Sequence, residues 1–203
     1  SDHYVRDEAR LTAALNEAAA ARLRAGELVL LGMEPEEADP ELGYVVPSGP
    51  SRPGELPRVS RFVEKPSAGV AADLIAAGAL WNSFVFAADV STLIAMVRAS
   101  WPEVVDDLET ALARGPEAVG TLYERLPAID FSKHVLQGAE PRLRVVRVPP
   151  CGWSDLGTPR RVADCLAKLG STRAGAARGG RSLHEAVNLA AACARLSYAG
   201  AGA

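Results

Sequence analysis

Residues 151–159 read CGWSDLGTP, and this stretch lies between a strand-like segment and a helix-like segment. Residues 142–148, RLRVVRV, precede it as a β-strand that two prolines close. After it, Thr158 is a favourable N-cap, and the proline that follows suits the first position of a helix. The glycine and the cap explain the turn, but they do not explain why Asp155 stands beside Trp153. We expect Trp153 to pack beneath the turn and to orient the carboxylate.

The alternation of strands and helices extends along most of the chain. Short runs of aliphatic, β-branched and aromatic residues predict strands at 27–33, 58–65 and 79–87. Caps, Ala- and Leu-rich patterns and terminal glycines predict helices at 7–25, 67–78, 89–100 and 102–115. This alternation predicts an α/β layered fold with a mostly parallel sheet.

Composition and charge exclude several classes of protein. The 203 residues carry a formal net charge of -3, from 22 basic and 25 acidic residues, which argues against a nucleic-acid-binding protein. No apolar run approaches the roughly 20 residues of a membrane-spanning helix, so no membrane association is expected. The three cysteines are widely spaced and odd in number, which favours a reducing cytoplasm over a disulfide framework.

The ends of the chain differ in character from its middle. The sequence opens SDHYVRDEARL, with neither a Met nor a leading strand, so we expect a fragment of a longer protein. Residues 1–170 are expected to form one part of a domain. Residues 171–181, STRAGAARGGR, have the composition of a flexible linker, and residues 182–203 are expected to form a last helix and a tail.

Polar residues near the ends of the predicted strands are candidates for binding, because open α/β sheets bind ligands at the carboxyl ends of their strands. Glu64 could accept hydrogen bonds from hydroxyls and Lys65 could meet a phosphate, although the two could also form a surface ion pair. Asn82 lies inside an apolar run. Its amide either bonds to backbone at a bend or faces a polyhydroxylated ligand.

Two aspartates are candidates for a metal site. By itself, Asp2 is compatible with a helix cap and Asp155 with an ordinary turn. Two carboxylates could also hold Mg²⁺, which takes oxygen ligands and usually only one or two carboxylates together with substrate phosphates. The two residues are 155 − 2 = 153 positions apart, so their spacing does not show that they meet.

The order of the short motifs is more specific than any single motif. The chain contains, in this order, SDHYV, LGMEP, ELGYVV, VSRFVEKP, GALWNSFVF, AIDFSKHVL and GWSDLGTP. Over roughly residues 1–165 this set resembles the sugar-1-phosphate nucleotidyltransferases, and among them most closely the mannose-1-phosphate guanylyltransferases. The resemblance implies a Rossmann-like, glycosyltransferase-A-like layered fold with a mainly parallel mixed sheet. It also implies transfer of a guanylyl group from GTP to mannose 1-phosphate, with release of pyrophosphate.

The same resemblance implies a role for each candidate residue. Asp2 and Asp155 would coordinate a catalytic Mg²⁺, and Lys65 would act with them in catalysis. The sugar phosphate would be bound through the backbone of Gly43, the carboxylate of Glu64, the ammonium of Lys65 and the amide of Asn82. Because the reaction is an in-line attack on a phosphate, catalysis would consist mostly of positioning and charge stabilisation.

The chain departs from the family pattern at three places. The usual GYGYI is LGYVV at residues 42–46, and the usual DYAVME is DFSKHVL at residues 130–136, where Asp130 is expected to cap a short helix. The glycine-rich G-x-G-x-R loop, whose N–H groups would hold the triphosphate, does not occur in the chain. We therefore expect these 203 residues alone to be inactive.

Two alternatives remain open at the level of the sequence. The acceptor could be another hexose 1-phosphate, such as glucose 1-phosphate, with UTP or dTTP as the donor. Alternatively, the chain could belong to a non-catalytic regulatory subunit that binds sugar nucleotides. A homodimer is one option for its oligomeric state.

Overall fold

A computed structural model of the chain describes residues 2–21, 23–49 and 55–175, and the structural statements below refer to these residues. The chain folds into two compact units. One unit comprises Ala9–Pro149, and the other joins Ser1–Glu8 to Pro150–Ala203. The two units are described in turn.

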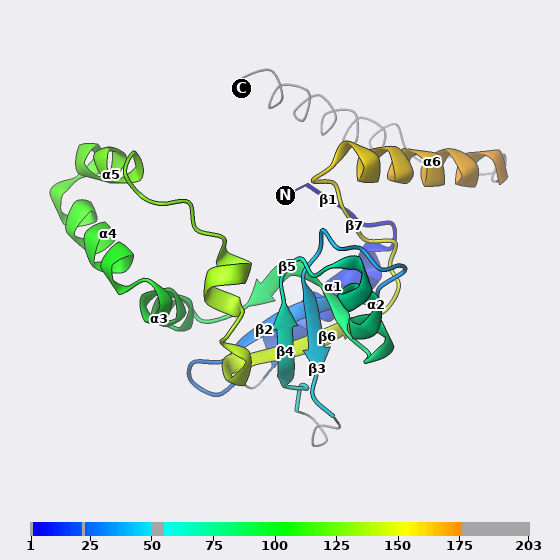
Figure 1. Cartoon of the computed structure of the whole chain (residues 1–203), viewed down its shortest axis with the longest axis horizontal. Helices are drawn as coiled ribbons and strands as arrows, with labels where there is room; N and C mark the ends of the chain where they lie inside the picture. The colour runs from blue at the N-terminus through cyan, green and yellow to red at the C-terminus, as the bar shows by residue number, and fades with distance from the viewer. Residues whose placement is uncertain (1, 22, 50–54, 176–203) are drawn as a thin grey trace. The chain divides into compact units, whose positions relative to one another are not determined.

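A five-stranded sheet forms the centre of the unit Ala9–Pro149 (Figure 1). Its strands, in sheet order, are β4 (Val59–Val63), β3 (Tyr44–Pro47), β5 (Leu80–Ala87), β2 (Leu28–Met33) and β6 (Leu143–Val148). Only β2 and β6 pair in parallel, whereas the other three neighbouring pairs are antiparallel. The α/β class with a mixed sheet is therefore confirmed, but the prediction of a mainly parallel sheet is wrong for these strands.

The insertion of β3 accounts for two of the three antiparallel pairs. Strands β4 and β5 are joined through the helix α2 (Ala68–Ala76) and run in the same direction, as strands joined by a helical crossover do. Strand β3 lies between them and is antiparallel to both. Strands β4 and β5 are therefore parallel to each other but do not pair; each pairs with β3 instead, in antiparallel orientation. The order of strands and helices along the chain does not reveal this insertion.

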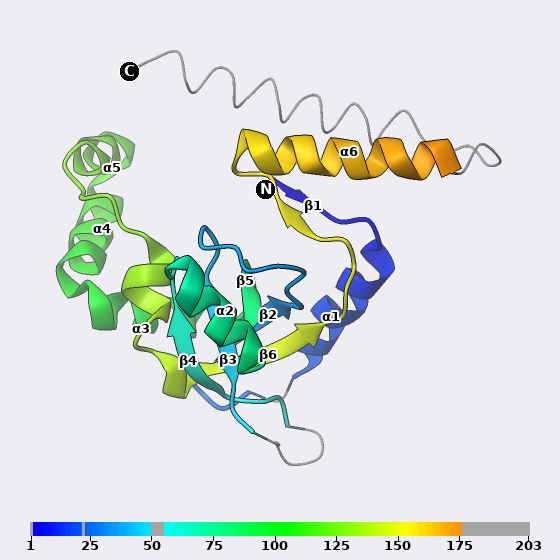
Figure 2. The same cartoon turned by 45° about the vertical axis from the view of Figure 1, so that its right-hand side comes forward.

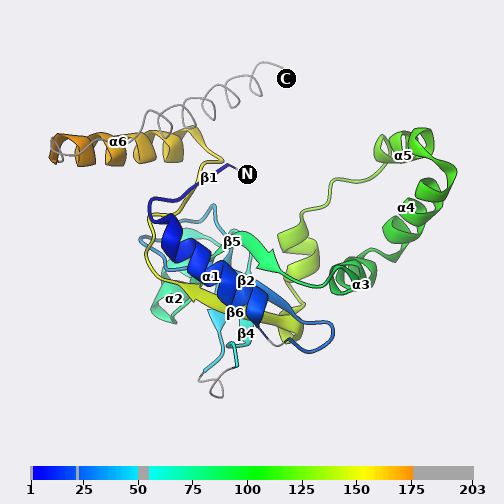
Figure 3. The same cartoon turned by 180° about the vertical axis from the view of Figure 1, so that it is seen from behind.

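Helices cover both faces of the sheet. Figures 1 and 3 view the chain from opposite sides and show α2 on one face and α1 (Glu8–Ala20) on the other. The remaining helices of this unit are α3 (Val90–Ser100), α4 (Pro102–Arg114), α5 (Pro116–Tyr123), the π-helix η1 (Ser132–Leu136) and the 3₁₀-helix η2 (Glu140–Arg142). The four helices predicted in this region are confirmed, and α5 is additional.

One apolar core lies where the sheet meets α3 and η1. Strand β2 is buried at all six positions, because it has strand neighbours on both edges and helices on both faces. Leu30, Leu80 and Val145 of the sheet pack with Met96 of α3 and Leu136 of η1. Full burial of one such side chain contributes about 1.5–3 kcal/mol to stability.

The second unit pairs two segments from distant parts of the sequence. Strand β1 (His3–Tyr4) lies antiparallel to β7 (Ser154–Asp155), and α6 (Pro159–Gly175) follows β7 (Figure 2). Helix α6 continues through residues 171–175, where a linker was predicted. The rest of that predicted linker and the predicted tail, residues 176–203, lie outside the described residues.

One finding concerns membranes. Within the described part of the chain, no helix combines the length and the apolar character that crossing a bilayer requires.

Candidate functional site

The pairing of β1 with β7 brings the two predicted aspartates together. His3 is opposite Asp155 in the register, and the backbone N–H of Leu156 donates to the carbonyl oxygen of Asp2 over 2.7 Å. As a result, one potential ligand atom each from Asp2, His3 and Asp155 lies within 4.8 Å of the other two. We call these three residues the carboxylate cluster.

Both carboxylate oxygens of Asp155 accept hydrogen bonds from residues of the same unit. The backbone N–H of Gly157 donates to Oδ1 over 2.8 Å, and Nη1 of Arg161 donates to Oδ2 over 2.8 Å. A Cβ at position 157 would lie 3.0 Å from Oδ1, so a glycine suits this close approach of backbone to carboxylate. The turn therefore fixes the direction of the Asp155 side chain.

Trp153 is buried and contacts His3, the residue of β1 that pairs with Asp155 of β7. Its side chain is buried, as expected for a residue beneath the turn, but its ring packs edge-on against His3, with 5.4 Å between the ring centroids. The groups that orient Asp155 are Gly157 and Arg161. Arg161, which lies on α6 six residues after Asp155, was not identified from the sequence.

A second cluster forms in the unit Ala9–Pro149 because β3 pairs with two strands at once. Tyr44 is opposite Val63 of β4 and opposite Trp81 of β5. In antiparallel pairing, the residue before Tyr44 must then face the residue after each partner. Gly43, Glu64 and Asn82 consequently meet at one end of the sheet, and we call them the acceptor cluster. The backbone N–H of Asn82 donates to the carbonyl oxygen of Gly43 over 2.8 Å.

The carboxylate of Glu64 is held in a space that the glycine leaves open. A Cβ on residue 43 would lie 2.4 Å from Oε2 of Glu64 and 3.3 Å from Cβ of Asn82. Oε2 is buried and accepts no hydrogen bond from the residues that the structure describes. Burial raises the pKa of Glu64, the nearby Asp130 raises it further, and Lys65 opposes both effects. A buried carboxylate oxygen without a donor is costly, which points to a ligand that supplies one.

Asn82 has hydrogen-bond partners within the protein. Its Oδ1 accepts from the backbone N–H of Phe84 over 3.2 Å, and its Nδ2 donates to Oγ of Ser132 over 3.3 Å. The first bond is the backbone contact at a bend that was one of the two sequence interpretations. Ser132, the first residue of η1, was not identified from the sequence as part of a site.

Backbone strain marks the same region. Among the described residues, the non-glycine residues with positive φ are Lys65, at 45°, and Phe84, at 59°. Lys65 directly follows Glu64, and Phe84 bonds to the side chain of Asn82. A non-glycine residue in this conformation costs about 1–3 kcal/mol, and such strain is concentrated at functional sites. The acceptor cluster is therefore a candidate site on physical grounds that are independent of any resemblance.

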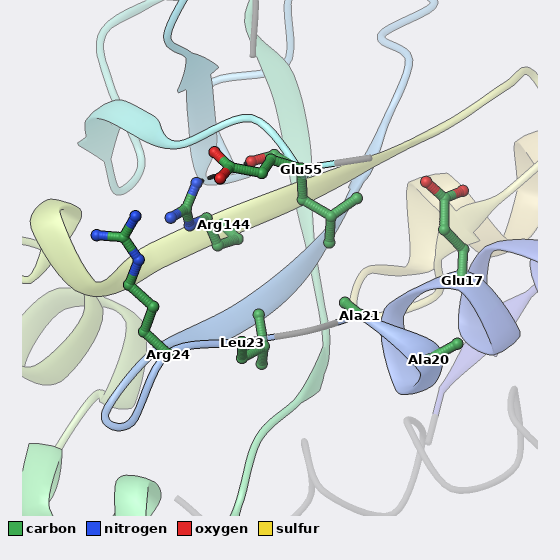
Figure 4. Close-up of a pocket in the computed structure, with 8 residues that line it drawn as sticks. Glu17, Ala20, Ala21, Leu23, Arg24, Glu55 and Arg144 are labelled. Atoms are coloured by element: carbon green, nitrogen blue, oxygen red, sulfur yellow. Dashed lines mark hydrogen bonds between the residues drawn. The ribbon is translucent and has the colours of Figure 1, made fainter. Parts of the chain in front are cut away.

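A pocket of about 480 Å³ lies elsewhere in the same unit. Figure 4 shows Glu17, Glu55 and Arg144 among the side chains around it. Arg144 is engaged in the structure: its Nη2 donates to Glu27 Oε1 over 2.9 Å and its Nη1 to the carbonyl oxygen of Leu56 over 3.0 Å. None of the six predicted site residues lines this pocket, so it does not coincide with either cluster.

The mixed sheet with helices on both faces defines a layered α/β domain. A crystal structure from Thermus thermophilus, described as a mannose-1-phosphate geranyltransferase, matches the chain with a TM-score of 0.70 and 34% sequence identity. The match covers 82% of this chain and 48% of that one. The model of the family described as nucleotidyl transferase matches residues 1–171, and the chain belongs to this family.

Curated relatives are consistent with this assignment. The xanthan biosynthesis protein XanB of Xanthomonas campestris pv. campestris (strain B100) is 32% identical over 181 residues, which are 86% of this chain and 38% of that protein. A Vibrio cholerae protein provisionally assigned as a mannose-1-phosphate guanylyltransferase is 28% identical over 163 residues, or 78% of this chain and 35% of that protein. The chain thus spans 38% or less of the length of these two relatives.

Proposed function

We propose that the protein containing this chain transfers a guanylyl group from GTP to mannose 1-phosphate and releases pyrophosphate and GDP-mannose. The observation that carries the proposal is the buried Oε2 of Glu64, which has no donor among the described residues and faces the backbone of Gly43. The ordered motifs, the family membership and the provisional assignment of the Vibrio cholerae relative support this choice of substrates.

The acceptor cluster is suited to a sugar. A hydroxyl group of a hexose is a neutral donor that can form a hydrogen bond with a buried carboxylate oxygen. This charge-assisted bond would offset the free-energy cost of burying Oε2 of Glu64 without a donor. Because residue 43 has no side chain, the sugar can approach the backbone beside Glu64. The exposed ammonium of Lys65, directly after Glu64, would bind the phosphate of the same ligand as a point charge.

The carboxylate cluster is suited to Mg²⁺. Asp2 and Asp155 offer the oxygen ligands that Mg²⁺ prefers, and their ligand atoms lie close enough to share one ion. His3 offers a nitrogen, which suits transition metals better than Mg²⁺. When bound, the ion would neutralise charge that develops on the phosphates during the transfer.

The contribution of the chain to the reaction would be positioning. Lys65 and Glu64 would fix the two ends of the sugar phosphate, so that its phosphate oxygen is aligned for in-line attack on the α-phosphate of the nucleotide. The backbone N–H of Gly157 would keep the Asp155 carboxylate in one orientation. No proton has to be removed from a phosphate oxygen at neutral pH, so the mechanism needs no general base from these residues.

The experiment is a substrate matrix. The full-length protein is incubated with Mg²⁺, with GTP, UTP or dTTP, and with mannose 1-phosphate or glucose 1-phosphate, and the pyrophosphate released is measured. We expect the largest kcat/KM for GTP with mannose 1-phosphate. Preference for another pair would reassign the substrates. Binding of GDP-mannose without turnover of any pair would identify a regulatory subunit instead.

A further inference from the structure

The ion pair between Arg161 and Asp155 lies inside the proposed metal site. Nη1 of Arg161 is 2.8 Å from Oδ2 of Asp155, and the side chains are 9% and 25% exposed, respectively. Oδ2 belongs to the same carboxylate that, with Asp2 and His3, forms the carboxylate cluster. A cation of the protein itself therefore already neutralises one of the two candidate metal ligands.

We propose that Arg161 is a positioning residue that acts as an internal counter-ion for Asp155, so that a divalent cation binds the carboxylate cluster only in competition with this ion pair. The inference rests on the proposed function in one respect, because the proposed function assigns a divalent cation to Asp2 and Asp155. In this proposal Arg161 does not coordinate the ion but lowers the affinity of the site for it.

The sign of the effect follows from charge and geometry. A guanidinium stays protonated, so a divalent cation at Asp155 is repelled by a permanent positive charge within a few ångströms. Removing that charge favours the cation. The N–H of Gly157 donates to the other oxygen, Oδ1, so the carboxylate should keep its direction when Arg161 is replaced. Loss of Arg161 should therefore strengthen, not weaken, binding of the metal.

The arrangement also links metal binding to the nucleotide. Mg²⁺ in proteins usually takes part of its ligands from substrate phosphates, and a guanidinium released from a carboxylate can pair with a phosphate. The bare cluster would then bind a divalent cation weakly, and the complete site would bind it well only when a polyphosphate is present.

The test measures binding of Mn²⁺ to the full chain without nucleotide, by electron paramagnetic resonance of the free ion. Arg161→Gln removes the charge and should lower the Kd for Mn²⁺ by about tenfold. Arg161→Lys keeps the charge and should stay within about twofold of the wild type. Arg160→Gln is the matched control, because it removes an equal charge from the preceding, exposed position, and it should change the Kd by less than about twofold.

Asp155→Asn separates failure of the inference from failure of the proposed metal site. Binding of Mn²⁺ that is unaffected by Asp155→Asn would remove the metal site itself. Binding that depends on Asp155 but is unchanged or weaker in folded Arg161→Gln would overturn only the role of Arg161. If Arg161→Gln does not fold, Arg161→Met, which keeps the apolar stem, replaces it and is judged by the same Kd. If neither the wild type nor Arg161→Gln binds Mn²⁺ measurably, this result also counts against the inference.

Discussion

Asp155 and Glu64 are both carboxylates beside a strand end, yet their hydrogen bonding is opposite. Both oxygens of Asp155 accept hydrogen bonds from the protein, one from an arginine and one from a backbone N–H. Oε2 of Glu64 is buried and accepts none from the described residues. The two carboxylates would therefore bind a ligand in different ways. A ligand of Asp155 would have to displace a hydrogen-bond donor of the protein, whereas a ligand of Glu64 would supply a donor that Oε2 lacks.

The electrostatic surroundings differ in the same sense. Arg161 supplies a positive charge next to Asp155, whereas Asp130 adds a negative field to the burial of Glu64 and the two together raise the pKa of Glu64. If Asp155 binds a metal ion, the first arrangement competes with that ion for the carboxylate. The second destabilises the folded chain and favours a ligand with a hydroxyl donor. Variants at each site should therefore change function and stability in different proportions.

The largest effect is expected at Asp155. In the full-length protein, Asp155→Asn should lower kcat with Mg²⁺ by about 10³-fold or more, because it removes a charge from the proposed metal site. Steady-state kinetics measures the loss, and far-ultraviolet circular dichroism checks the fold. Asp164→Asn, at an exposed position of α6, is the control and should retain activity. Retention of Mg²⁺-dependent turnover by Asp155→Asn would remove Asp155 as a ligand.

A methyl group at Gly43 should damage the acceptor cluster. Gly43→Ala places a Cβ 2.4 Å from Oε2 of Glu64, so the carboxylate must move. We expect at least about tenfold weaker binding of mannose 1-phosphate and a loss of about 1–3 kcal/mol in the free energy of unfolding. Calorimetry and urea denaturation measure the two quantities. Gly49→Ala is the matched control, because a Cβ there meets nothing within 4 Å. Equal behaviour of the two variants would refute the packing described here.

Ser132→Ala should have a smaller effect. It removes the hydroxyl that accepts from Nδ2 of Asn82, and the buried amide loses that bond. The expected cost is about 1–3 kcal/mol in the free energy of unfolding, with binding of the sugar phosphate weakened only a few-fold. Ser60→Ala, in an exposed position of β4, should cost less than about 1 kcal/mol. A Ser132→Ala variant as stable as Ser60→Ala would show that the bond to Asn82 contributes nothing.

Glu64→Gln should have the smallest effect on stability. Unlike Gly43→Ala and Ser132→Ala, it should raise the free energy of unfolding. The pKa of Glu64 is raised in the folded chain, so between the ordinary value of 4.5 and the raised value the unfolded chain loses its proton first. Rising pH through this window therefore destabilises the wild type, and the penalty persists at neutral pH. Glu64→Gln should unfold at higher urea concentration than the wild type at pH 7.

The difference between Glu64→Gln and the wild type should shrink at pH values below 4.5, where the wild-type carboxyl is protonated in both states. Binding of mannose 1-phosphate should weaken at pH 7 in spite of the added stability. Glu103→Gln, on the exposed side of α4, is the control and should show neither effect. A less stable Glu64→Gln variant at pH 7 would contradict the electrostatic account of this residue.

Secondary-structure elements were predicted correctly where residues within the element itself signal its type and its ends. The cap at Ser67, the apolar run at 27–33 and the proline that opens α4 predict elements that the structure contains. Strand β3 is not among the strands predicted from the sequence, because its identity as a strand depends on pairing with β4 and β5. The two antiparallel pairs that β3 forms were missed for the same reason.

The candidate site shows the same limit. The candidate residues Gly43, Glu64 and Asn82 could be named from motifs, but their convergence follows from the double pairing of Tyr44, which no local pattern encodes. The meeting of Asp2 with Asp155 is likewise a consequence of long-range pairing between β1 and β7. Arg161 and Ser132 were missed because each is defined by the side chain that it contacts, not by its neighbours in sequence.

The pairing of His3 with Asp155 also sets an order of events during synthesis of the protein. Residues 3 and 155 are 155 − 3 = 152 positions apart, so β1 leaves the ribosome long before its partner exists. At about 5–20 residues per second, the delay is on the order of ten seconds or more. During most of that time β6, at residues 143–148, is also missing from the sheet of the unit Ala9–Pro149, and the carboxylate cluster cannot form. A nascent chain is therefore unable to bind a metal at this cluster until β7 has emerged.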